Sequence, residues 1–128
     1  MGKLKSFEEI TSWQKAREFN KKIYLATQQG EFKLDFDLAR QIRRASVSIT
    51  SNIAEGFERD TDKQFAQFLR MAKASAGEVR SQLYLALDLE YISAANFKGL
   101  KEEITEISKL IGGFINYLQN NNHTTSSS

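Results

Sequence analysis

The chain contains no proline in 128 residues. At the usual frequency of about 5%, roughly six prolines are expected in a chain of this length. Proline interrupts helix interiors, and it also starts many of the turns on which sheet proteins depend. Its absence, together with a total of only seven glycines, favours long uninterrupted helices over a fold rich in turns.

Apolar residues recur at helical spacing in four segments, which predict helices at about 12–29, 37–57, 61–90 and 94–119. The residues expected to cap the helix starts are Thr11, Asp35 or Asp37, Thr61 and Ser93. Because the connections are short, neighbouring helices must be antiparallel, and the fold is predicted to be an all-α, up-down-up-down four-helix bundle. Residues 1–119 are expected to form this single domain, followed by a disordered polar tail at 120–128.

Two apolar faces are informative about the core. The first helix is expected to bury one face, made of Trp13, Ala16, Asn20, Ile23, Tyr24 and Thr27. The fourth helix carries a heptad-like seam made of Phe97, Leu100, Ile104, Ile107, Ile111, Phe114 and Leu118. A seam of this length predicts a helix that packs along the whole bundle.

Several functional classes lack the residues that they need. Without cysteine there are no disulfides, thiolate metal sites or cysteine nucleophiles. The one histidine, His123, falls in the tail, so a di-iron or histidine-based site is not expected. The N-terminus has no apolar signal segment, and no run is long and apolar enough to span a membrane. We therefore expect a cytoplasmic protein that has no metal or cofactor and is not an enzyme.

A polar stripe runs beside the apolar face of the second helix and is matched by polar residues of the third. It is predicted to form an internal network made of Gln41, Ser48, Asn52, Glu55, Ser75 and Glu78. The two carboxylates could perform acid–base chemistry if their environments separate their pKa values. The favoured interpretation is that the stripe fixes helix register through hydrogen bonds.

Apolar residues extend around most of the circumference at the end of the third helix and outside the seam of the fourth. The outer face of a helix in a monomeric bundle is normally polar. These residues therefore predict a homo-oligomer interface, although ordinary exposed apolar surface is the alternative. The predicted interface residues are Tyr84, Leu85, Leu89, Leu110, Ile115 and Tyr117.

The basic residues are concentrated early in the chain, although the net charge is only +2. Residues 1–44 hold ten Lys and Arg against six Asp and Glu. The candidates for contacts with nucleic-acid phosphates are Arg17, Lys21, Arg40, Arg43, Arg44, Arg70 and Lys73. In a monomer the same residues would be ordinary solvated surface. The sequence shows no alternation of aromatic and basic residues of the kind that binds single strands.

Three segments resemble the small four-helix bundle proteins called 23S rRNA intervening sequence proteins. They are WQKA at 13–16, QIRRASVSITSNIAEG at 41–56 and FxxFLxxAxASxxE at 65–78. The resemblance covers roughly residues 7–119. Thr50 departs from the family pattern, which commonly has proline there, and Ala74 departs from a common glycine. Ala74 would loosen a close helix contact.

The resemblance implies a bundle that assembles into a homopentamer and has no established enzymatic activity. Some relatives are encoded within intervening sequences of large-subunit rRNA genes. Others are accessory proteins of diversity-generating retroelements, which bind nucleic acid and a reverse transcriptase through basic residues. Arg40, Arg43, Arg44 and Lys73 are the counterparts expected here. We thus expect either an oligomer that binds RNA or DNA, or a scaffold for a partner such as a reverse transcriptase without nucleic-acid affinity of its own.

Overall fold

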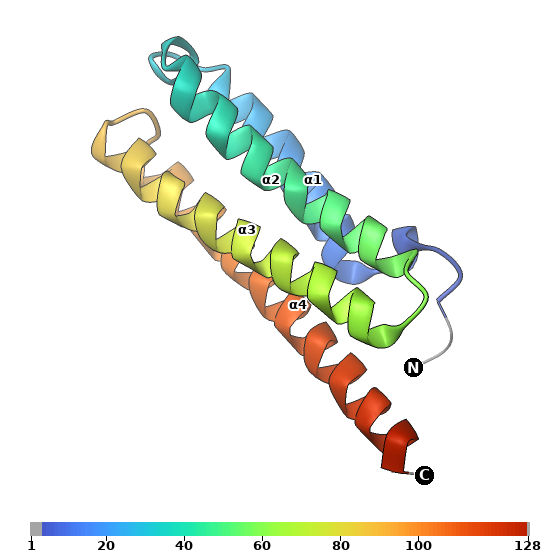
Figure 1. Ribbon diagram of the computed structural model, residues 1–128. Helices are drawn as coiled ribbons and strands as arrows, with labels where there is room; N and C mark the ends of the chain where they lie inside the picture. Colours follow the sequence, from blue (N-terminus) through green and yellow to red (C-terminus); the bar gives the residue numbers. More distant parts are fainter. Residues whose placement is uncertain (1–3, 128) are drawn as a thin grey trace.

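The computed structural model describes residues 4–127, with side chains for residues 4–120. Its helices are α1 (Thr11–Thr27), α2 (Phe36–Phe57), α3 (Asp62–Asp88) and α4 (Ala94–Ser127), with short 3-10 helices at Phe7–Glu9 and Phe32–Leu34. α2 packs against α1 and α3, and α4 packs against α3 and α1, which closes the bundle (Figure 1). The predicted all-α four-helix bundle is confirmed, and residues 4–127 contain no strand.

Three of the four helices begin at the predicted N-cap residues. Backbone amides of the first turns donate to the side-chain oxygens of Asp35, Thr61 and Ser93, each at 3.1 Å. These bonds satisfy amides that have no partner inside the helix. α4 is helical past the predicted end at 119. The disordered tail predicted for 120–128, His123 included, stays a prediction, because the side chains beyond Asn120 lie outside the described residues.

The start of α1 differs from the prediction. Ile10 is its N-cap, and Thr11 is the first helical residue. The side chain of Gln14 donates to the carbonyl of Glu8 at 2.7 Å, so it does not form a capping box with Thr11. The cause is the 3-10 helix at Phe7–Glu9, which brings its own carbonyls to the helix start.

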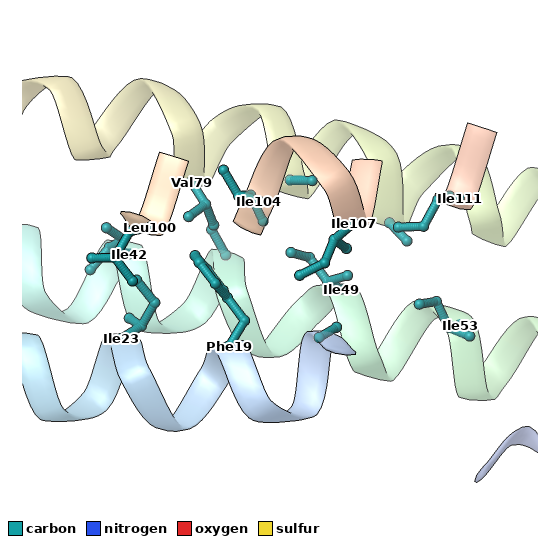
Figure 2. Close-up of a cluster of buried hydrophobic side chains, with 14 of the residues drawn as sticks. Phe19, Ile23, Ile42, Ile49, Ile53, Val79, Leu100, Ile104, Ile107 and Ile111 are labelled. Carbon is teal, nitrogen blue, oxygen red and sulfur yellow. The ribbon is translucent and has the colours of Figure 1, made fainter. Parts of the chain in front are cut away.

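The core lies between all four helices and is filled mainly by isoleucine, leucine and alanine (Figure 2). The α4 seam is confirmed at its centre, where Ile104 and Ile111 are fully buried. The predicted buried face of α1 was wrong at two positions: it omitted Phe19, which is buried, and included Tyr24, which is exposed. Phe19, which was not predicted, is 0% exposed, whereas Tyr24 is 40% exposed. The buried face of α1 is therefore rotated from Tyr24 toward Phe19.

α2 and α3 approach each other closely at Gly56. A Cβ atom at this position would lie 2.7 Å from the Cβ of Phe68 and 2.8 Å from the Cδ1 of Phe65. Such separations are too short for carbon atoms, so the contact requires glycine. Ala74, where the sequence suggested a loosened contact, is exposed and does not lie in this contact.

Gly56→Ala is expected to destabilise the protein by about 1–3 kcal/mol, because the new methyl group must push the two phenylalanines apart. Gly77→Ala is the matched control, since Gly77 lies inside α3 with nothing within 4 Å of an added Cβ. It should gain about 1 kcal/mol from helix propensity. Chemical denaturation would measure the free energy of unfolding of both variants. Equal changes in this free energy would contradict the close contact at Gly56.

α3 ends in a tight turn that carries the one positive φ found among the described non-glycine residues, Glu90 at 61°. The amide of Glu90 donates to the carbonyl of Leu87 at 2.9 Å, and that of Tyr91 donates to the carbonyl of Ala86 at 2.8 Å. This pair of bonds is a Schellman motif, whose left-handed position is usually glycine.

Glu90→Gly should therefore stabilise the protein by about 1 kcal/mol, because glycine has no Cβ atom to crowd the left-handed backbone. Glu58→Gly serves as the control, since Glu58 ends α2 with an ordinary φ of −81°. Thermal and urea unfolding would measure the stability of both variants relative to the wild type. A gain for Glu58→Gly as large as that for Glu90→Gly would count against the explanation.

Candidate nucleic-acid interface

The seven predicted basic residues lie in two groups. Five are on α1 and α2, whereas Arg70 and Lys73 are on α3. The Cε of Lys73 lies 3.3 Å from where a Cβ on Gly112 of α4 would be. Lys73 therefore borders α4, away from the arginines of α2. The structure supports one basic surface at α1 and α2, and it separates Lys73 from it.

The packing of α2 explains why its arginines face outward. Ile42 and Ile49 are fully buried in the core. Ser48 donates to Ser75 of α3 at 2.6 Å, so a second side of α2 lies against α3. The remaining side, which carries Arg40 and Arg44, is exposed beside α1.

α1 supplies the other half of the surface. Arg17, Lys21, Tyr24 and Gln28 recur at helical spacing and are all exposed, so they share one side of α1. The side chain of Asn20 joins this helix to α2, accepting from Ser46 at 2.5 Å and donating to Thr50 at 3.2 Å. This polar contact was not predicted, because its members are on different helices.

An open hollow of about 770 Å³ lies where α1, the 3-10 helix at Phe32–Leu34 and α2 meet. Its charged and aromatic lining residues are Tyr24, Lys33, Phe36, Arg40, Arg43 and Arg44. The other lining residues are uncharged, so no carboxylate lines the hollow. Four cationic side chains without a lining carboxylate give the hollow a positive potential, which favours an anionic ligand.

Arg43 is held in place at the edge of this hollow. Its Nε donates to the hydroxyl of Thr27 at 2.7 Å, and its guanidinium lies 4.5 Å from the ring centre of Tyr24. Thr27 is 1% exposed and donates in turn to the carbonyls of Ile23 and Tyr24. A buried hydroxyl and an aromatic face thus orient the guanidinium, which leaves its terminal nitrogens without a protein partner among the described residues.

The other cations of the hollow are only weakly neutralised. Arg40 pairs with Asp37 at 3.5 Å, and both side chains are highly exposed. Exposed pairs of this kind contribute little to stability. Arg44 and Lys33 form no ion pair within the described part of the chain.

The exposed aromatic rings and Lys33 are the parts of this surface that were not predicted from the sequence. Phe36 is 75% exposed, and Tyr24 is 40% exposed. Because Tyr24 and the arginines belong to different helices, no alternating pattern appears along the chain. The folded bundle nevertheless places aromatic and basic side chains around one hollow.

Asp35 positions the segment that carries Lys33 and Phe36. Its Oδ1 caps α2, and its Oδ2 accepts from the hydroxyl of Tyr91 at 2.9 Å. The ring of Tyr91 stacks on Phe32 at 5.2 Å. The α3–α4 connection therefore fixes the connection between α1 and α2 beside the hollow.

The hydrogen bond to Asp35, assisted by desolvation, raises the pKa of Tyr91 above its usual value of 10.0. The folded state thus prefers the neutral phenol. Its stabilisation is complete below pH 10 and is lost as the pH rises through the folded-state pKa. The stability difference between the wild type and Tyr91→Phe should accordingly shrink above about pH 10.

An absorbance titration of tyrosine ionisation gives the direct readout. Asp35→Asn should lower the pKa of Tyr91 toward its usual value while retaining a residue that can cap α2. A titration that is the same in Asp35→Asn and in the wild type would contradict the assigned cause.

The predicted polar stripe is only partly connected. Ser48 bonds Ser75, and Asn52 donates to the carbonyl of Ser48 at 2.9 Å. Glu78 is exposed and accepts from Gln82 at 3.2 Å. Gln41 and Glu55 are also exposed, and neither bonds the other stripe residues among those described. The serine pair therefore joins α2 to α3, while both carboxylates lie in solvent.

The predicted interface residues are mostly on the surface of the single chain. Tyr84, Leu85, Leu89 and Tyr117 are exposed, and Leu110 is half-buried. Ile115 departs from the prediction, because it is 7% exposed and belongs to the core. It lies four residues after Ile111, on the inner side of α4.

The part of the chain that the structure describes lacks two other kinds of feature. It contains no group of three or more histidine, aspartate or glutamate side chains arranged to hold a metal ion. No helix there is long and apolar enough to cross a membrane.

The sequence profile of the 23S rRNA-intervening sequence protein family matches residues 8–113, which is most of the chain. The chain belongs to this family. A crystal structure of a protein of unknown function from the S23 ribosomal protein family of Bacteroides thetaiotaomicron is similar, with 28% identity and a TM-score of 0.75. The match covers 82% of this chain and 98% of that one. No curated protein matches the sequence. Neither description names an enzymatic activity.

Proposed function

We propose that this family member is a non-enzymatic, homo-oligomeric protein that binds nucleic acid through the basic side of α1 and α2. The observation that carries the proposal is the hollow lined by Lys33, Arg40, Arg43 and Arg44 without a carboxylate. Side chains of this kind bind phosphates and release counterions, which gives affinity without sequence preference. Arg17 and Lys21 extend the same charge along α1.

The proposed assembly is supported by apolar side chains at the C-terminal end of α3, where Leu89 is the C-cap residue. Leu85 is 46% exposed, and Leu89 is 43% exposed. Exposed apolar residues that lie together are typical of contact surfaces. Five copies is the number that the family resemblance implies. A ring would repeat the basic surface, so that weak phosphate contacts add along one nucleic-acid strand.

The proposal is tested by mass and by binding. Light scattering should give a multiple of 14.6 kDa, with five copies expected. A labelled mixed-sequence RNA or DNA should bind, with an affinity that falls steeply between about 50 and 200 mM salt.

Arg44→Gln should weaken binding to any sequence and reduce the slope of log K on log salt by about 1. Arg80→Gln makes the same change of charge on the side of α3 that carries Lys73, and it should have little effect. A monomer would contradict the assembly. An oligomer that binds no nucleic acid at about 50 mM salt would contradict the binding and favour the scaffold for a protein partner.

A further inference from the structure

We infer that the hollow beside α2 holds an unpaired nucleobase against Phe36 while the surrounding arginines bind the flanking phosphates. The protein is then a binder of single-stranded RNA or DNA. This inference rests on the proposed function and adds the class of nucleic acid that the site takes.

Phe36 is the first observation. It is 75% exposed, although Phe32, four residues earlier, is 1% exposed and stacks on Tyr91. The same short segment thus supplies one phenylalanine to the core and leaves another on the rim of a basic hollow. Nothing in the described part of the chain packs a ring against Phe36.

The second observation is the arrangement of charge around that ring. Arg43 is fixed by Thr27 and Tyr24, so its position does not depend on a ligand. Arg40 and Arg44, four residues apart on α2, line the same hollow. The open space of about 770 Å³ is within the range of small-molecule and cofactor sites.

These features together select unpaired nucleotides. An aromatic ring can stack on a base only where the face of that base is free, and in a duplex the neighbouring bases cover both faces. Stacking platforms combined with a basic groove are how proteins hold single strands without reading sequence. A site for duplex backbone alone needs cations and gains nothing from an exposed phenylalanine.

The test compares the full-length protein and its variants on three ligands: a mixed-sequence single strand, its duplex, and an abasic strand with the same phosphates. Fluorescence anisotropy would measure the affinities, with RNA and DNA strands in parallel. Phe36→Ala should weaken binding of the intact single strand by between about 5- and 150-fold. The slope of log K on log salt should be the same for this variant as for the wild type, because phenylalanine carries no charge. Binding of the duplex and of the abasic strand should be nearly unaffected.

Leu34→Ala is the matched control, since Leu34 is 70% exposed in the same segment but does not line the hollow. It should bind all three ligands like the wild type. Light scattering and thermal unfolding of Phe36→Ala should show the wild-type mass and fold. A changed mass would assign Phe36 to a contact between copies and overturn the inference.

Two outcomes separate this inference from the proposed function. If Arg44→Gln weakens binding but Phe36→Ala does not, the hollow binds phosphate alone, and the base site is refuted while the proposed function stands. If the wild type binds none of the three ligands at about 50 mM salt, both fail.

Discussion

The close packing of α2 against α3 determines which side of α2 carries the proposed functional surface. Gly56 admits no Cβ atom at the contact, and Ser48 bonds Ser75 across it at 2.6 Å. With its small residues against α3 and its isoleucines in the core, α2 has one side left, and that side carries the arginines. The family segment that contains Gly56 therefore fixes the rotation of α2 about its axis, and this rotation determines where the arginines of α2 lie.

Two further contacts turn those charges into a defined site. The buried hydroxyl of Thr27 orients Arg43, and Asp35 links the start of α2 to Tyr91 in the opposite connection. Both contacts are made by polar groups at the bundle end where α1 ends and α2 begins. The hollow is thus a consequence of how the bundle ends, and the carboxylates of Glu55 and Glu78, exposed in solvent, play no part in it.

Much of the fold could be predicted because it depends on local patterns. The α4 seam and the caps at Thr61 and Ser93 are properties of residues a few positions apart, and they were confirmed. The rotation of α1 was not predictable, since Phe19 and Tyr24 both fit an apolar face and only contacts with other helices decide between them. The hollow was missed for the same reason: its rings and cations come from separate elements. Of the cations that line the hollow, Arg40, Arg43 and Arg44 were recognised from the sequence, whereas Lys33 was not, because it lies in the connection between α1 and α2.

Lysine footprinting would show whether nucleic acid binds on the α1–α2 side, as proposed. The protein would be acetylated with and without a bound single-stranded RNA, and the modified lysines located by mass spectrometry. Lys21 and Lys33 lie on the proposed surface, whereas Lys73 borders α4 and Lys98 lies on the outer side of α4. If RNA binds on the α1–α2 side, it should protect Lys21 and Lys33 and leave Lys73 and Lys98 reactive. Protection of Lys73 and Lys98 with Lys21 and Lys33 still reactive would contradict binding on that side.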